Sequence, residues 1–476
     1  MKKILFVGGE ALPFASTGGL GDVMGSLPDA LAENGELSVS VVMPLYGSIS
    51  DTYRSQMEKI AEFTVQLSWR KQYCGVYRYK SKSATYYFLD NEYYFNRSTI
   101  YGQYDDGERF AFFSRAVLDM MPVIGYYPDI LHANDWQAAL AVIYLKEKYA
   151  KNPTYADIKT VYTIHNIDYQ GIFDFAILGD VFDLSEESRP LLEFDGCINL
   201  SKGAIVACDR LTTVSRRYAE ELRSPYFSGK LAGILAEQAG KTDGIVNGID
   251  LAYYNPRRDP DIVASYSVED RSGKAENKAH LQRLFGLPES PTTPLIAMVS
   301  RLAGHKGFDL VQYVMEELLA EDVQIVLLGT GERQYEEFFA DMANRYPSKM
   351  GVSLTFNKGL SKQIYAGADL FLMPSKSEPC GLSQMIASAY GTVPVVREVG
   401  GLYDTVKPYN PETRQGNGIT FVTYNAHDML DALRRGIALY RGDPACWESL
   451  VSNVMTADFS WNASAAGYLS IYDTIS

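Results

Sequence analysis

Short apolar runs alternate with helical patterns along most of the chain, and this alternation constrains the fold more than any other feature. Apolar runs at 4–7 and 160–164 end in Gly or His. Amphipathic stretches such as 22–33 and 136–149 follow several of these runs. Short apolar runs separated by helices are typical of βαβ units in a doubly wound parallel sheet. The sequence therefore predicts an α/β fold.

The alternation pauses between about 241 and 293 and resumes with the apolar run at 295–299. Because each half carries its own βα series, we predict two Rossmann-like domains with a hinge near residue 245. Within the first half, 66–79 and 84–89 have the pattern of an antiparallel excursion. The last segment, from 459 onward, predicts one more helix.

Charge excludes some partners. The chain of 476 residues has a formal net charge of −14 and a hydrophobic content of 46%. Proteins that bind nucleic acid show a basic footprint, so an acidic chain argues against nucleic acid and against anionic membranes. A neutral polymer such as a glucan meets no electrostatic penalty. No apolar stretch approaches the roughly 20 residues of a membrane span.

The cysteines indicate a reducing compartment. Five cysteines are scattered along the chain, and none forms a C-x-x-C pair. An odd, scattered set is typical of a reduced, cytoplasmic protein, and it lacks the spacing of a structural zinc or iron–sulfur site.

The segment 374–384 follows the apolar run 369–373 and precedes an amphipathic run, so we expect a strand, a turn with Glu378, and a helix from about Leu382. Ligands of open α/β sheets bind at the carboxyl ends of the strands, and helix N-termini there favour diphosphates. This pattern predicts a site for a phosphorylated, hydroxyl-rich ligand. Cys380 is interpreted as a packing residue, because the nearby carboxylate disfavours a thiolate.

Two cations, Arg301 and Lys306, lie in the glycine-containing loop 300–307 after the first strand of the second half. Arg offers a planar fork and Lys a point charge, and together they suit a diphosphate. The alternative is a pair of surface charges on a loop.

In the first half, Gly18, Gly19 and Asp22 open the helix after the first strand. The spacing differs from the dinucleotide fingerprint, so a nicotinamide cofactor is poorly supported. A plain strand–helix turn capped by Asp22 remains the alternative. His165 ends the 160–164 run and is either a ligand-binding or a structural histidine. Asp135 follows another strand end and is either a helix cap or a site residue.

In sequence order, these segments resemble the bacterial glycogen synthase and plant starch synthase family. The matching segments are T-G-G-L-G-D-V at 17–23, H-A-N-D-W at 132–136, H-N-I-D-Y-Q-G at 165–171, N-G-I-D at 247–250, K-A-E-N-K at 274–278, S-R-L-A-G-H-K-G at 300–307, E-P-C-G-L-S-Q at 378–384 and G-G-L-Y-D-T-V at 400–406. Their joint order along nearly the whole chain is highly specific.

The resemblance implies a GT-B fold, in which two Rossmann-like domains face each other across a cleft. The implied domains are 1–244, on the acceptor side, and 245–456, on the nucleotide-sugar side, with 457–476 as a helix that crosses back to the first. The implied enzyme is a retaining hexosyltransferase that transfers glucose from ADP-glucose to the non-reducing end of an α-1,4-glucan, either glycogen or starch. It needs no metal ion, and ADP-glucose is a co-substrate rather than a cofactor.

The resemblance also implies residue roles. Arg301 and Lys306 are expected to hold the diphosphate, and Glu378 to bind glucose hydroxyls near the reacting carbon. The other expected contacts are His165 with the donor glucose, Gly18, Gly19 and Asp22 with the donor, Asn247 at the hinge, Asp135 near the acceptor, Phe356 against the adenine, and the backbone of Cys380, Gly381, Leu382 and Ser383 around sugar and phosphate.

Two departures leave alternatives open. The family often has Lys where this chain has Ser16, which removes a donor-facing cation and bears on donor selectivity. Related retaining transferases carry a second Glu where this family, and this chain with Ile386, has none. A glucosyltransferase using UDP-glucose and a non-catalytic glucan-binding or priming homologue remain as alternatives. The presence of Arg301, Lys306 and Glu378 argues against the second.

Overall fold

The computed structural model describes residues 1–33 and 35–475 and divides the chain into two compact units. Unit 1 comprises Met1–Gly248 together with the segment from Trp461 onward, and unit 2 comprises Ile249–Ser460. The break after Gly248 lies a few residues beyond the hinge predicted near 245. Ser476, the last residue of the predicted crossing segment, lies outside the described residues.

Unit 1 contains a nine-stranded sheet with the order β12-β11-β7-β6-β1-β2-β5-β4-β3. All neighbours pair in parallel except β4, which pairs antiparallel with both β5 and β3. The strands are β1 (Lys2–Val7), β2 (Leu37–Pro44), β3 (Glu58–Leu67), β4 (Arg70–Lys80), β5 (Thr85–Asp90), β6 (Ile130–Asn134), β7 (Lys159–Ile164), β11 (Arg210–Thr213) and β12 (Thr242–Gly244).

The predicted antiparallel excursion is therefore confirmed for β4 and β5, whereas most of β3 was missed. β3 is the edge strand, and its exposed positions carry charged residues such as Glu58 and Glu62. These residues interrupt the apolar run by which a buried strand is recognised. A small second sheet, β8-β10-β9, is formed by Ile172–Phe173, Cys197–Asn199 and Glu193–Phe194.

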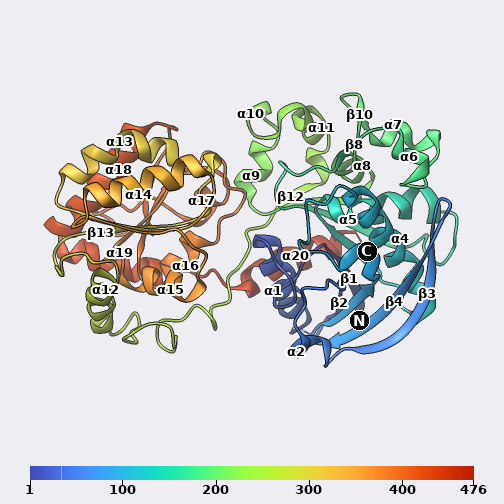
Figure 1. Cartoon of the computed structure of the whole chain (residues 1–476), viewed down its shortest axis with the longest axis horizontal. Helices are drawn as coiled ribbons and strands as arrows, with labels where there is room; N and C mark the ends of the chain where they lie inside the picture. The colour runs from blue at the N-terminus through green and yellow to red at the C-terminus, as the bar shows by residue number, and fades with distance from the viewer. Residues whose placement is uncertain (34, 476) are drawn as a thin grey trace. The chain divides into compact units, whose positions relative to one another are not determined.

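Helices cover both faces of the larger sheet of unit 1 (Figure 1). On one face, α1 (Gly19–Glu33) packs against α20 (Trp461–Thr474), and on the other lie α4 (Asp106–Ile124), α5 (Trp136–Tyr144) and α8 (Leu200–Ala207). The shorter helices are α2 (Asp51–Arg54), α3 (Glu92–Phe95), α6 (Ile177–Asp180), α7 (Arg189–Leu192), α9 (Arg216–Glu221), α10 (Pro225–Ser228) and α11 (Ala232–Glu237).

Polar contacts attach α20 to the sheet of unit 1. The Tyr472 hydroxyl lies 2.7 Å from Nδ1 of the buried His132 on β6. His132 Nε2 lies 2.6 Å from the Thr163 hydroxyl on β7. Ser464 Oγ donates to the Val246 carbonyl at 2.6 Å. A chain of satisfied, buried polar groups specifies one docking position for the helix.

Unit 2 has a six-stranded parallel sheet with the order β15-β14-β13-β16-β17-β18. Numbered from β13, this is the 3-2-1-4-5-6 order of a doubly wound Rossmann fold. The strands are β13 (Leu295–Val299), β14 (Gln324–Leu328), β15 (Met350–Ser353), β16 (Leu370–Met373), β17 (Val393–Arg397) and β18 (Ile419–Phe421). The core lies along β13, β14 and β16, where Ile296, Ile325 and Leu370 are fully buried.

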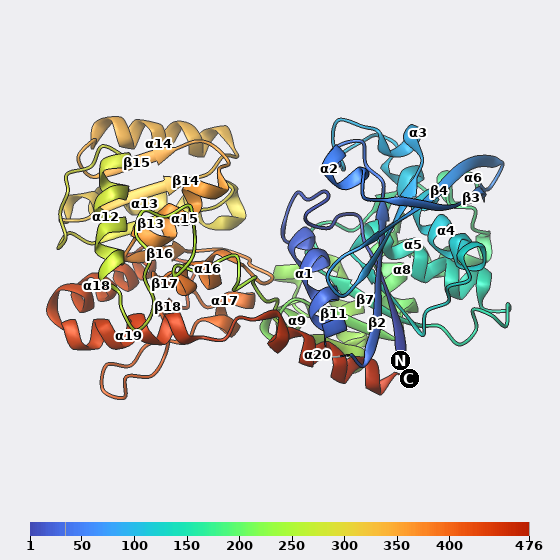
Figure 2. The same ribbon diagram turned by 90° about the horizontal axis from the view of Figure 1, so that it is seen from below.

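In unit 2, α13 (Phe308–Ala320) and α14 (Arg333–Arg345) cover one face of the sheet, and α12 (Ser272–Leu284) and α15 (Lys358–Gly367) cover the other (Figures 1 and 2). The remaining helices are α16 (Ser383–Ala389), α17 (Gly400–Thr405), α18 (Ala426–Gly442) and α19 (Pro444–Thr456). No helix in the described part of the chain is long and apolar enough to cross a membrane.

Candidate active site

In unit 2, Glu378 lies in the loop after β16 and is only 6% exposed. Its Oε2 accepts hydrogen bonds from Lys306 Nζ at 2.7 Å and from the hydroxyl of the buried Ser375 at 3.0 Å. Among the described residues, no group donates to Oε1. The carboxylate is therefore held through one oxygen, and the other keeps its capacity to accept a hydrogen bond.

The Lys306–Glu378 contact depends on a close approach between the loops that follow the neighbouring strands β13 and β16. Gly307 has φ +81°, and a Cβ at this position would lie 2.1 Å from the Pro374 carbonyl oxygen. The Lys376 N–H donates to the His305 carbonyl at 2.8 Å. Only glycine allows this backbone contact, which places the lysine against the carboxylate.

A third loop, after β17, packs against the same turn. Gly400 has φ +46°, and a Cβ there would lie 2.0 Å from the Glu378 carbonyl oxygen. The Gly401 N–H donates to this carbonyl at 3.0 Å. Fully buried Gln384 donates from Nε2 to the carbonyls of Cys380 and Gly381, at 3.1 and 2.9 Å. These contacts hold the backbone of the Glu378 loop from both sides.

The structure places the other predicted residues of unit 2 as follows. Arg301 is exposed, and its guanidinium forms no ion pair within the described residues. Cys380 is buried with a free thiol. Leu382 and Ser383 stand at the start of α16, a helix of seven residues. Phe356, expected against the adenine, lies in the loop after β15, which ends at Ser353, and is 83% exposed.

In unit 1, His165 lies at the carboxyl end of β7, and its Nε2 is 2.9 Å from Asn134 Oδ1. Asn134 donates from Nδ2 to the carbonyls of Val7 and His132, at 3.3 and 3.1 Å. This orientation makes Oδ1 an acceptor, so Nε2 of His165 carries the proton and Nδ1 is left as an acceptor. Burial lowers the pKa of His165 to about 3, so its ring is neutral near pH 7.

Asp135 does not cap α5. Its side chain makes no cap hydrogen bond, and its Oδ1 instead accepts from the His165 N–H at 2.7 Å. Burial raises the pKa of the carboxyl to about 7. The contact joins the carboxyl ends of neighbouring strands β6 and β7 and brings Asp135 and His165 together. Trp136, the next residue, packs its ring against Phe110 and Phe173.

The glycine turn of unit 1 is open. Gly18 and Gly19 are exposed, α1 begins at Gly19, and half-buried Asp22 lies in its first turn. Ser16 Oγ donates to the Gly18 carbonyl at 3.1 Å. Asn247 follows β12 and is 6% exposed, and its Oδ1 has no hydrogen-bond partner within the described residues.

The sequence analysis missed Glu10, which is 3% exposed and follows β1. Its Oε2 accepts from the Thr17 N–H at 2.5 Å and from the Thr17 hydroxyl at 3.0 Å. Glu10 therefore fixes Thr17, the residue directly before the glycine turn at Gly18 and Gly19. Burial raises the pKa of Glu10 to about 7. Its signal in the sequence was a carboxylate just after a strand-ending glycine pair, Gly8 and Gly9.

The raised pKa of Glu10 predicts a pH-dependent stability. Folded Glu10 keeps its proton up to about pH 7, whereas the unfolded chain loses it near 4.5. This group therefore lowers the free energy of unfolding progressively as pH rises through that window, by on the order of 1–3 kcal/mol. In urea unfolding, Glu10→Gln should gain stability relative to wild type between these pH values and show a constant difference above them.

Glu33→Gln, at the exposed end of α1, controls for the loss of one acidic group. Parallel pH profiles of wild type and Glu10→Gln would contradict the raised pKa.

No three His, Cys, Asp or Glu side chains within residues 1–33 and 35–475 are arranged to hold a metal ion.

A family model described as the starch synthase catalytic domain matches residues 3–237, and one described as glycosyl transferases group 1 matches 284–440. A glycogen synthase from Geobacillus thermodenitrificans is 49% identical over 475 residues, which cover 99% of this chain and 98% of that protein. The chain belongs to the glycogen and starch synthase family. The glycogen synthase of Geobacillus stearothermophilus is 48% identical over the same length.

Solved structures agree with this assignment. The catalytic domain of starch synthase IV from Arabidopsis thaliana, bound to ADP and acarbose, matches with a TM-score of 0.91 and 32% identity, covering 100% of this chain and 99% of that one. Sucrose-phosphate synthase from Thermosynechococcus elongatus has a TM-score of 0.62 at 18% identity over 100% and 99% of the two chains, a likeness of fold alone. The predicted GT-B fold is confirmed, and this family member is a glycosyltransferase.

Proposed function

We propose that this glycosyltransferase transfers glucose from ADP-glucose to the non-reducing end of an α-1,4-glucan such as glycogen or starch, with retention of the anomeric configuration. The observation that carries the proposal is the buried Glu378 carboxylate paired with Lys306 at the carboxyl edge of the unit 2 sheet. The naming of the full-length relatives as glycogen synthases supports the substrate class.

Departure of the diphosphate is the step that needs positive charge. Lys306 has three N–H donors and uses one of them on Glu378, so the others can bind phosphate oxygens. The exposed fork of Arg301, on the same loop, supplies a second cation. Fixed cations stabilise a leaving phosphate more in a water-poor site than in bulk water.

The sugar is held by acceptor groups. In unit 2, Glu378 Oε1 accepts hydrogen bonds from glucose hydroxyls. In unit 1, His165 Nδ1 is an acceptor for sugar hydroxyls, and Asp135 keeps the His165 backbone in place. In the proposed step, the acceptor hydroxyl oxygen attacks the anomeric carbon on the face from which ADP leaves. The new C–O bond forms as the C–O bond to phosphate breaks, and the hydroxyl proton passes to a phosphate oxygen. Same-face attack preserves the configuration.

We also propose that the reaction needs no metal ion or cofactor, because the two cations supply the charge that a divalent ion supplies in other transferases. The five cysteines are free thiols, and this supports a cytoplasmic location. The acidic chain is expected to bind neither nucleic acid nor membranes.

One assay tests the proposal. Purified protein is incubated with radiolabelled ADP-glucose or UDP-glucose plus glycogen, with and without a chelator. We expect label in glycogen from ADP-glucose, release of that label by an α-1,4-specific exo-hydrolase, and no effect of the chelator. Incorporation from UDP-glucose alone would overturn the donor. Binding of glycogen without incorporation from either donor would favour the non-catalytic homologue.

Ser16 stands where the family often has Lys, and this difference predicts an effect of position 16 on donor binding. Ser16 lies beside the exposed glycine turn, so Ser16→Lys should lower the KM for ADP-glucose about fivefold, as expected for ~1 kcal/mol from one partly exposed charge. Ser16→Gln has a similar length without the charge and is the control. If initial-rate kinetics give equal KM values for both variants and the wild type, position 16 does not contribute to donor binding.

A further inference from the structure

Several exposed aromatic side chains of unit 1 lie in segments that follow the carboxyl ends of strands. Trp69 follows β3, Tyr93 and Tyr104 follow β5, and Tyr169 follows β7, with exposed fractions of 70, 60, 92 and 56%. Exposed aromatic side chains grouped at one edge of a sheet mark a binding surface more often than scattered ones do. Of these four residues, we consider Trp69, whose side chain is fixed by several polar and charged contacts.

Charged groups on three elements hold the Trp69 side chain in place. Its Nε1 donates to Asp180 Oδ1 on α6 at 2.6 Å. The Arg70 guanidinium lies 4.4 Å from the centroid of the indole ring. Arg70 in turn forms ion pairs with Asp180 and with Glu108 on α4, each at 3.1 Å. The indole is thus fixed at its edge and supported on one face, while most of its surface faces solvent.

The topology places Trp69 on the edge that carries His165 and the glycine turn. β3 runs in the same direction as β1, because two antiparallel steps, through β4, separate it from β5. Four strand spacings separate β3 from β1, roughly 19 Å across the sheet. Residues 70–74 of β4 pair only with β3, so the hairpin turn extends about 17 Å past the end of β5.

We propose that Trp69 is a distal acceptor subsite. There, a long α-glucan chain stacks one of its sugar rings on the indole, while the non-reducing end of the chain lies at the edge of the sheet that carries His165. A pyranose ring has an apolar face that an aromatic ring covers, and rigid amphipathic rings bind at a low cost in conformational entropy. The two ion pairs that Arg70 forms beside the ring, with Glu108 and with Asp180, offer hydroxyl-binding groups. The inference rests on the proposed function, which makes a glucan the acceptor.

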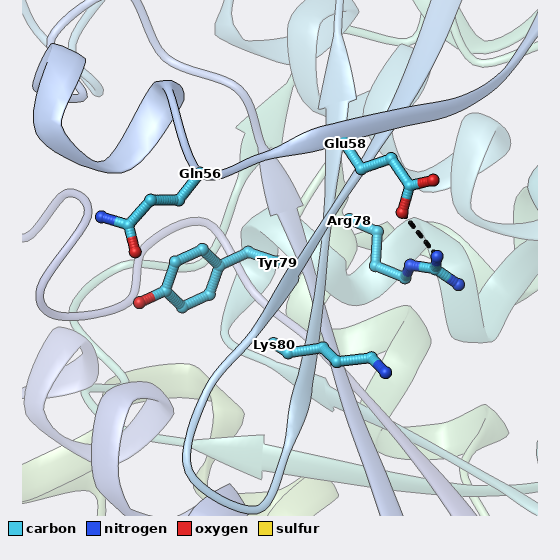
Figure 3. Close-up of a pocket in the computed structure, with 5 residues that line it drawn as sticks. All are labelled: Gln56, Glu58, Arg78, Tyr79 and Lys80. Carbon is cyan, nitrogen blue, oxygen red and sulfur yellow. Dashed lines mark hydrogen bonds and ion pairs between the residues drawn. The ribbon is translucent and has the colours of Figure 1, made fainter.

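At the opposite end of the same hairpin, the aromatic residue Tyr79 is half-buried rather than exposed. There, Gln56, Glu58, Arg78, Tyr79 and Lys80 line a shallow polar hollow, in which Arg78 and Glu58 form an ion pair at 2.6 Å (Figure 3). Both the start of β3 and the end of β4 lie at the amino-terminal edge of the sheet, away from the candidate catalytic residues. We therefore assign the subsite to the Trp69 end alone.

The subsite predicts that acceptor length matters. In Trp69→Ala, the ratio of kcat/KM for glycogen to kcat/KM for maltotriose should fall roughly tenfold, the equivalent of one well-packed aromatic contact. Maltotriose is too short to span both positions. Trp69→Phe keeps an aromatic face and should lose less. Tyr313→Ala removes an aromatic that is 73% exposed on α13 of unit 2, and should leave the ratio as in wild type.

Binding is measured separately by affinity electrophoresis in gels that contain glycogen. Trp69→Ala should migrate faster than wild type and Tyr313→Ala. The subsite would be overturned if glycogen retarded Trp69→Ala as much as wild type, whether or not the variant changes its oligomeric state. It would also be overturned if the glycogen-to-maltotriose ratio of kcat/KM in Trp69→Ala equalled that of wild type. Because retardation requires no catalysis, a wild type that binds glycogen through Trp69 but transfers no glucose would contradict the proposed function and leave the subsite standing.

Discussion

Replacing Glu378 with Gln is expected to lower kcat for glucan synthesis at least roughly 100-fold while the protein remains folded. The carboxylate is buried and its Oε2 binds both Lys306 and Ser375, so the substitution removes a negative charge that orients a cation. A glutamine amide that turns its NH2 group toward Lys306 adds repulsion between donors. Initial rates with saturating ADP-glucose and glycogen measure the loss, and circular dichroism checks the fold.

Glu337→Gln is the matched control, because Glu337 is an exposed carboxylate on α14 of the same unit, and it pairs with Arg333 on its own helix. It should keep kcat within about twofold of wild type, as surface ion pairs contribute little. Near-normal glucan synthesis by Glu378→Gln would remove this residue from the mechanism. A loss confined to KM would assign it to ground-state binding of the sugar.

The placement of Glu378 and Lys306 at the carboxyl edge of the unit 2 sheet was predictable because its signals are local. A buried strand followed directly by a turn and a helix fixes where Glu378 must lie, and the same holds for Lys306 after β13. Since β13 and β16 are neighbours in a parallel sheet, their carboxyl ends meet at one edge, as the 3-2-1-4-5-6 order requires. The pairing of the two side chains follows from this placement together with Gly307.

Other features were decided by contacts between distant segments. Asp135 directly before a helix has the sequence pattern of an N-cap, yet its carboxylate binds the backbone of His165, thirty residues away. Glu10 has the sequence position of an ordinary loop carboxylate, yet its Oε2 accepts hydrogen bonds from the N–H and the hydroxyl of Thr17. Phe356 lies three residues beyond the end of β15, in a loop whose course the sequence does not determine. No local pattern distinguishes these outcomes, because each depends on tertiary packing.

Lys278→Met is expected to destabilise the protein by about 3–5 kcal/mol, as does removal of one partner from a buried ion pair. The second lysine of K-A-E-N-K lies on α12 and is 6% exposed. Its Nζ bonds Asp369 Oδ2 at 2.6 Å and the Tyr440 hydroxyl at 2.9 Å. Asp369 Oδ2 also accepts from the Leu295 N–H at 2.8 Å, so an unpaired carboxylate would remain buried between β13 and β16.

Arg283→Met is the control on the same helix, because the Arg283–Glu289 pair is 56 and 50% exposed and should contribute less than about 1 kcal/mol. Urea unfolding followed by fluorescence compares the two variants, and equal midpoints would show that Lys278 contributes no more than a surface charge. A difference between the two variants would give the family segment K-A-E-N-K at 274–278 a structural role. The segment attaches α12 to β13 and β16, and the loops after these strands carry Lys306 and Glu378. Its loss should lower stability before it changes the KM for ADP-glucose.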